Sequence, residues 1–164
     1  MTTTWAEFAN ADPELAAFGI ERVKCEVGPG RFEGRIAYQA TLRLDGSPRV
    51  HPVTPWIAAG LLCVSFRATS PKVKEVARDG RYALHSSQPW EDHDGDHGEF
   101  MARGWLEQIS SSHPAVTARP GGELSFALLH YTCSIEEAVA TEYIGPGETP
   151  VYRRWKSPSG DAAG

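Results

Sequence analysis

Residues 36–56 constrain the fold most, because a period-two strand pattern there runs directly into a turn dipeptide. Apolar residues occupy alternate positions over residues 36–44, as in a half-buried β-strand. Asp45-Gly46 follows and favours a tight hairpin, because both residues tolerate positive φ. Residues 49–56 then return as a second strand. Pro52 and Pro55 cannot donate ladder hydrogen bonds, so this strand must be interrupted, bulged or at a sheet edge.

The pattern changes from strand to helix after a third strand, predicted over residues 61–66. Ser70-Pro71 is a typical N-cap and first-turn pair. Asp79-Gly80 predicts the end of that helix. At the N-terminus, Thr4 and Glu7 form a capping box that opens one short helix. Asp12-Pro13 opens a second helix, which we expect to stop at Gly19.

The rest of the chain predicts more strands than helices. Expected are strands over residues 82–86, 99–108, 127–143 and 151–155, a polar loop over 88–98, and a short helix opened by Ser112-His113-Pro114. These elements indicate a mainly β fold with α additions, an antiparallel β-barrel. The length of 164 residues fits a single domain. In it, we expect residues 1–35 to form a helical arm and first strand, and residues 36–164 to form the barrel.

Charge argues for a small anion as ligand. The net charge of −5 is unfavourable for nucleic acid or an anionic membrane. Residues 43–81 nevertheless carry seven basic and three acidic side chains. This local excess suits a small anion, although solvated helix and strand faces would give the same count.

The cysteines and the N-terminus indicate a cytoplasmic protein. Cys25, Cys63 and Cys133 contain no C-x-x-C pair, and we interpret them mainly as buried small hydrophobes in a reducing compartment. The longest nearly apolar run, residues 56–66, is too short to cross a bilayer. We expect no secretion signal, because the first residues lack a basic and an apolar region.

Residues 65–72 hold the pattern that points to chemistry. A strand ends, a hydroxyl-rich loop follows, and a helix begins. The first turn of a helix attracts anions through its free N–H groups and partial positive charge. Arg67, Ser70 and Lys72, with Arg49 from the hairpin, would complete a phosphate site. An ordinary N-capped helix with solvated basic side chains remains the alternative.

The order of these segments resembles the pyridoxamine 5′-phosphate oxidase-like proteins, the flavin- and deazaflavin-binding split β-barrels. The motifs that carry the resemblance are Asp45-Gly46-Ser47-Pro48, Pro52-Val53, Ser70-Pro71-Lys72 and Arg78-Asp79-Gly80-Arg81. It covers residues 36–86 well and the remainder more loosely, through Arg103-Gly104-Trp105.

The resemblance implies an antiparallel split β-barrel that forms a homodimer, with FMN or a deazaflavin in each of two clefts between the subunits. By position, Arg49, Ser70 and Lys72 would contact the phosphate. The flavin ring would lie along the second strand and near the end of the third. The residues implied there are Val50, His51, Pro52, Val53, Thr54, Ser65, Phe66 and Arg67, with Glu99 and Phe100 approaching from a later strand.

The C-terminal region departs from the true pyridoxamine phosphate oxidases, whose R-x-H-x-R element has no counterpart in residues 149–155. The resemblance therefore implies an FMN-binding oxidoreductase that transfers hydride to or from another small molecule. Alternatives are a reductase that uses the deazaflavin coenzyme F420, a non-catalytic flavin or haem carrier or sensor, and a structural dimer with a vestigial cleft. No catalytic acid or base is identified. His51 is either a ligand-facing donor or an ordinary strand histidine, and Trp56 is a candidate to face a ring.

An acidic loop at residues 91–99 gives no metal site. Asp92, Asp94 and Asp96 alternate as in a calcium loop, but His97 replaces the required glycine. Gly95 disfavours the helix that His93 and His97 would need to bind zinc. We therefore expect a solvated loop and no metal.

Overall fold

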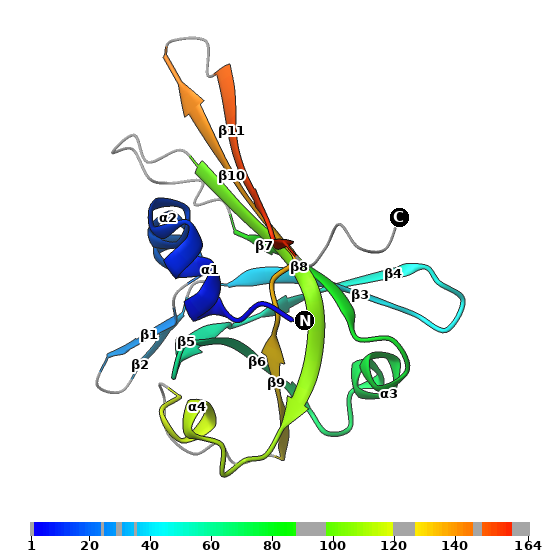
Figure 1. The fold of residues 1–164 in the computed structure, drawn as a ribbon. Helices are drawn as coiled ribbons and strands as arrows, with labels where there is room; N and C mark the ends of the chain where they lie inside the picture. The colour runs from blue at the N-terminus through cyan, green and yellow to red at the C-terminus, as the bar shows by residue number, and fades with distance from the viewer. Residues whose placement is uncertain are drawn as a thin grey trace.

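Nine strands form one curled antiparallel sheet in the part of the chain that the structure describes (Figure 1). The structure is a computed structural model and describes residues 2–23, 25–28, 31–34, 36–87, 98–119, 127–145 and 149–158. The helices are α1 (Trp5–Ala11), α2 (Pro13–Val23), α3 (Pro71–Arg78) and α4 (Pro114–Thr117). The strands are β1 (Cys25–Gly28), β2 (Arg31–Gly34), β3 (Ala37–Leu42), β4 (Pro48–Val53), β5 (Trp56–Ala58), β6 (Leu61–Arg67), β7 (Arg81–Ser86), β8 (Gly98–Ile109), β9 (Leu128–Cys133), β10 (Glu137–Ile144) and β11 (Thr149–Lys156).

The curl of the sheet makes a half-barrel, as the predicted β-barrel class requires. Its main path runs β4-β3-β7-β8-β9-β6-β5, with β10 paired to both β8 and β11. The long strand β8 pairs with β7 and β10 through residues 98–105 and with β9 through residues 106–109. The sheet therefore turns along β8, and β1 and β2 form a separate hairpin.

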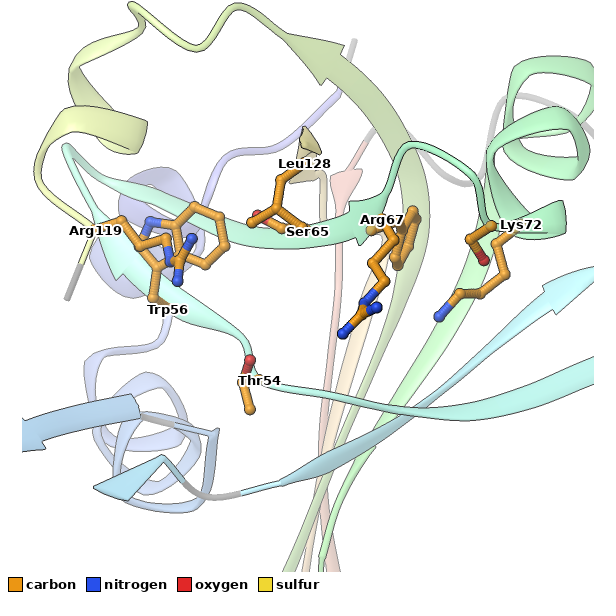
Figure 2. A pocket seen from close by; sticks show the side chains of 9 residues that line it. Thr54, Trp56, Ser65, Arg67, Lys72, Arg119 and Leu128 are labelled. Carbon is orange, nitrogen blue, oxygen red and sulfur yellow. The ribbon is translucent and has the colours of Figure 1, made fainter. Parts of the chain in front are cut away.

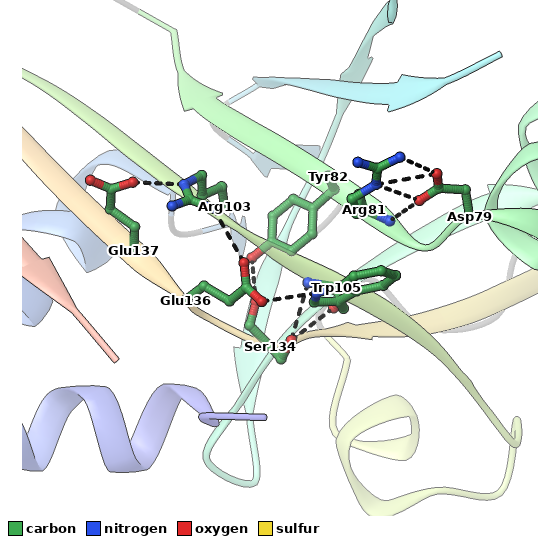
Figure 3. Close-up of polar contacts among 8 residues, drawn as sticks. All are labelled: Asp79, Arg81, Tyr82, Arg103, Trp105, Ser134, Glu136 and Glu137. Carbon is green, nitrogen blue, oxygen red and sulfur yellow. Dashed lines mark hydrogen bonds and ion pairs between the residues drawn. The ribbon is translucent and has the colours of Figure 1, made fainter. Parts of the chain in front are cut away.

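Gly104 permits that turn. The segment between β9 and β10 bonds to β8 on both sides of it, from Ser134 N–H to the Trp105 carbonyl and from Glu136 N–H to the Arg103 carbonyl. A Cβ on Gly104 would meet the Ser134 carbonyl oxygen, so only glycine fits this crossing. Side chains reinforce it: the Tyr82 hydroxyl donates to the Ser134 carbonyl, and Trp105 and Arg103 bind Glu136 (Figure 3).

The predicted hairpin is confirmed, and so is the interrupted, edge position that its prolines imply for the second strand. β3 and β4 are joined by a turn in which Gly46, but not Asp45, has positive φ. The Arg43 N–H bonds to the Ser47 carbonyl, which makes the loop one residue longer than a two-residue turn. Pro52 lies in β4, an end strand of the sheet path, and Pro55 lies in the break before β5.

Helices α1 and α2 close one side of the half-barrel. The capping box between Thr4 and Glu7 is confirmed. The expected stop of α2 at Gly19 was wrong, because the helix continues to Val23. Gly19 instead marks close packing, since a Cβ there would lie 2.7 Å from the Phe100 ring. Trp5 packs on the same ring edge-on, with centroids 6.1 Å apart.

The prediction of one strand over residues 127–143 was also wrong. The chain leaves β9 after Cys133 and enters β10 at Glu137, because these strands pair with different parts of β8. Ser70-Pro71 and Asp79 do begin and end α3 as predicted. Cys63 and Cys133 are buried, as expected, and burial raises the pKa of the Cys63 thiol to about 12.

Most of the polar loop predicted at residues 88–98 lies outside the described residues, as does the side chain of Cys25. Every helix that the structure does describe is too short or too polar to traverse a lipid bilayer.

Candidate functional site

A pocket of about 310 Å³ opens where β6 ends and α3 begins (Figure 2). It also reaches the break between β4 and β5 and Arg119, which follows the C-cap residue of α4. Its lining residues are Thr54, Trp56, Ser65, Phe66, Arg67, Ser70, Lys72, Arg119 and Leu128. Six of these, Thr54, Ser65, Phe66, Arg67, Ser70 and Lys72, are residues that the sequence placed in the cofactor site.

The lining is cationic. Arg67, Lys72 and Arg119 carry positive charge, and none of the described residues lining the pocket is acidic. Thr54, Ser65 and Ser70 add hydroxyls, which both donate and accept hydrogen bonds. Such a lining suits an anion with hydrogen-bonding oxygens.

The start of α3 is built to face this pocket. Ser70 is the N-cap, but its hydroxyl makes no capping hydrogen bond and lines the pocket instead. The positive end of the helix dipole adds to the attraction for an anion. Lys72 lies in the first turn, with its Nζ 4.8 Å from the centroid of the Phe66 ring. Burial and the nearby Arg49 lower the pKa of Lys72.

Arg49 does not line the pocket. Its guanidinium binds the Glu75 carboxylate through Nε and Nη2, at 2.8 to 3.0 Å. The Glu75 side chain is 12% exposed and the Arg49 side chain 31%, so the pair is partly shielded from water. Glu75 therefore pairs with the Arg49 guanidinium, which the sequence assigned to the phosphate. The pair was not foreseen because only the fold brings the Glu75 side chain of α3 beside Arg49 of β4.

His51 lies beneath the pocket rather than in its lining. It is 9% exposed and packs edge-on against Phe66, with ring centroids 5.6 Å apart. Neither ring nitrogen has a hydrogen-bond partner among the described residues. The same holds for the side chains of its strand neighbours Gln39 and Thr41. Burial, assisted by the charge of Lys72, lowers the pKa of His51 to about 4, so its imidazole is neutral near neutral pH.

This low pKa predicts acid-sensitive stability. Between pH 6.5 and about 4, unfolded His51 binds a proton that folded His51 does not. Stability must therefore fall as pH falls through this window, by about 2 kcal/mol from pH 7 to pH 5. Urea unfolding of wild type and His51→Gln measures this. As pH falls from 7 to 5, the difference in free energy of unfolding between wild type and His51→Gln should shrink by that amount. If both proteins lose stability in parallel, the pKa of His51 is not lowered in the folded state.

Ser65 forms a pair with His130 that the sequence did not reveal. Its Oγ lies 2.8 Å from His130 Nδ1, because the two residues are direct cross-strand partners on β6 and β9. Burial and then the charge of Arg119 lower the pKa of His130. No motif links residues 65 and 130 in the sequence, so only strand pairing could identify the pair.

The remaining candidates lie elsewhere. Val50 is 64% exposed and Pro52 is also exposed, both on the outer face of β4, whereas Val53 is buried. Glu99 on β8 accepts a hydrogen bond from the Tyr143 hydroxyl, outside the pocket lining. Phe100 is fully buried in the core.

Metal binding finds no support in the part of the chain that is described, which contains no group of three His, Cys, Asp or Glu side chains able to hold an ion. Residues 91–97 of the acidic loop lie outside that part.

Sequence comparison identifies no relative: no protein-family model and no curated protein matches the chain. Structure comparison finds solved proteins with a similar fold. PhzG from Burkholderia lata 383, solved with tetrahydrophenazine-1-carboxylic acid, superposes with a TM-score of 0.61 at 13% identity, over 96% of this chain and 89% of PhzG.

Two further solved structures have the same fold. A pyridoxamine 5′-phosphate oxidase-related, FMN-binding protein from Nostoc punctiforme has a TM-score of 0.51 at 10% identity, over 75% of this chain and 87% of its own. A haem-binding protein from Mycobacterium smegmatis has a TM-score of 0.51 at 14% identity, over 73% of this chain and 52% of its own. The predicted fold, an antiparallel split β-barrel, is therefore confirmed.

Proposed function

We propose that this chain, which has the split β-barrel fold of pyridoxamine 5′-phosphate oxidase-related proteins, is an FMN-dependent oxidoreductase. The observation that carries the proposal is the cationic pocket at the start of α3, whose described lining residues include no acid. A phosphate group of FMN carries up to two negative charges and needs several donors. The pocket offers them from the end of β6 and the start of α3.

The residues present fit the phosphate end of FMN. The Ser70 hydroxyl and the Lys72 ammonium both lie at the N-terminal end of α3, where the helix dipole favours an anion. Arg67 approaches from the end of β6. In the same proposal, the backbone of residues 50–54 lies along the flavin ring, with Thr54 at the pocket. Arg49 and Glu99 belong to this site only if the bound cofactor draws them in.

The flavin would supply hydride transfer, and the protein would bind, orient and shield it. Phe66 forms an apolar floor, since it is 1% exposed and packs against Tyr131 and His51. Neutral His51 places no charge beneath that floor. Lys72, held over the Phe66 ring, is the cation best placed to fix the cofactor's anionic end.

We also propose that the protein acts as a homodimer. The outer face of β3 and β4 exposes Tyr38 and Val50, at 49% and 64%. Neighbouring strands continue this face, because Tyr38 lies opposite His85 and His85 opposite Met101. A second copy of the chain would cover these apolar side chains. Residues 50–54 edge the same face, so such a dimer would place the cofactor next to the subunit interface.

An absorption spectrum, an FMN titration and sedimentation test the proposal together. The purified protein should show flavin bands, or gain them with added FMN, and should sediment as a dimer. Consumption of reduced cofactor with quinones or enones would establish turnover. Absence of flavin bands together with no FMN-induced rise in melting temperature would refute FMN binding.

The deazaflavin coenzyme F420 is the second candidate. Its side chain carries a phosphodiester with one charge, whereas FMN ends in a phosphomonoester. The pairing of Arg49 with Glu75 leaves one cation fewer for the phosphate group itself, which suits a singly charged phosphodiester better than a dianionic phosphomonoester. Parallel titrations with both cofactors distinguish the two. A flavin or haem carrier remains the non-catalytic alternative, which sustained turnover would exclude.

Glu75→Gln should tighten anion binding. The change removes a negative charge beside the site and releases Arg49, and a partly screened charge contributes about 1 kcal/mol, or about fivefold in affinity. Calorimetric titration with FMN measures the change. Glu107→Gln, which neutralises an exposed carboxylate outside this pocket, is the matched control. Equal FMN affinity in wild type and Glu75→Gln would show that Glu75 does not weaken the site.

A further inference from the structure

The pocket has a second cationic end, which the proposed phosphate contact leaves unused. Figure 2 shows Arg119 beside Trp56 on one side, with Lys72 on the opposite side and Ser65 between them. Arg119 directly follows the turn after α4, and Trp56 begins β5. One phosphate bound by Lys72 and Ser70 therefore accounts for only part of the pocket.

Trp56 gives Arg119 a defined position. The Arg119 guanidinium carbon lies 5.8 Å from the Trp56 ring centroid, within range of a cation–π contact. The ring itself is held, because its Nε1 donates to the Ala115 carbonyl at 2.9 Å and the residue is 2% exposed. An arginine positioned on a fixed ring loses less conformational freedom when it binds a ligand.

Two neutral side chains lie at this end of the pocket. His130 meets the Trp56 ring edge-on, with centroids 6.3 Å apart, and hydrogen-bonds to Ser65. Because burial and Arg119 lower its pKa, His130 adds no charge near neutral pH. The Arg119 end thus offers one cation with a neutral hydroxyl–imidazole pair, whereas the other end offers Lys72 and Arg67.

We propose that the Arg119 end binds the carboxylate of a small organic acid, as substrate beside the cofactor. A single planar guanidinium matches a single planar carboxylate, which it can bind through two parallel hydrogen bonds. The Ser65–His130 pair supplies the neighbouring polar contact. The role as substrate rests on the proposed function; the carboxylate site itself does not.

Nicotinate and nicotinamide test the site, because they differ only in carboxylate against neutral amide. Titration calorimetry should show that the wild type binds nicotinate at least tenfold more tightly than nicotinamide. Arg119→Gln should weaken nicotinate binding about tenfold to hundredfold, the effect of one charged hydrogen bond. Lys74→Gln, which removes an equal charge on the exposed side of α3, should leave it unchanged. Circular dichroism verifies the fold of both variants.

The outcomes separate this inference from the proposed function. If FMN binds but nicotinate affinity is the same in wild type and Arg119→Gln, or nicotinate binds no better than nicotinamide, the carboxylate site is refuted alone. If FMN fails to bind but nicotinate binding depends on Arg119, the carboxylate site stands and the FMN proposal fails.

Discussion

Lys72→Ala is expected to weaken FMN binding about tenfold to 150-fold. The change removes a charged donor from the first turn of α3, where it lines the pocket and lies over Phe66. A hydrogen bond to a charged group contributes about 1.5–3 kcal/mol, which converts to that range of affinity. Flavin fluorescence quenching on titration measures the change.

Lys74 provides the matched control for this experiment. It lies two residues further along the same helix, is exposed, and is not part of the pocket lining. Lys74→Ala should therefore keep wild-type FMN affinity, which separates a specific contact from a general loss of positive charge. If Lys72→Ala also kept wild-type affinity, Lys72 would have no part in the site. Lys72→Gln, which retains most of the stem over Phe66, should reproduce the loss.

Phe100→Ala is expected to reduce the free energy of unfolding by about 3–5 kcal/mol, the usual cost of deleting a buried aromatic ring. Phe100 is fully buried. Its ring lies against the Cα of Gly19 and the edge of Trp5, so it joins β8 to both α1 and α2. The cavity would open where two helices meet the sheet. Denaturant unfolding followed by tryptophan fluorescence measures the loss.

Tyr152→Ala removes a ring of similar size from an exposed position, since Tyr152 is 66% exposed. It should change stability by less than about 0.5 kcal/mol. A comparable loss in both variants would mean that Phe100 does not anchor the helices to the sheet.

Local structure was largely predictable because its causes are local. The capping box of Thr4, the N-cap at Ser70 and the alternation before Asp45-Gly46 act within a few residues, and each appears in the fold. The errors came where a distant partner overrode a local preference. Gly19 favours a helix end, yet α2 continues because the missing side chain lets the Phe100 ring approach.

That Ser65, Ser70 and Lys72 lie together at one end of the pocket was predictable for the same reason. The loop from Ser65 to Lys72 is continuous, so a strand end, hydroxyls and a helix start must lie together. The Arg119 end of the pocket was not predictable, because Trp56, Arg119 and His130 come from three separate segments. They meet only through the pairing of β6 with β5 and β9 and the packing of Ala115 in α4 beneath Trp56.

The amino-acid sequence by itself determined the hairpin before α3, the start of α3 and the presence of several basic side chains around that start. The tertiary structure decided which of those charges a ligand can use. Arg49 and Lys72 are equivalent by charge in the sequence, but the fold places the Glu75 carboxylate of α3 beside Arg49 and leaves Lys72 at the pocket. Electrostatic attraction depends on distance in space, so the choice between the two cations is made only when the chain folds.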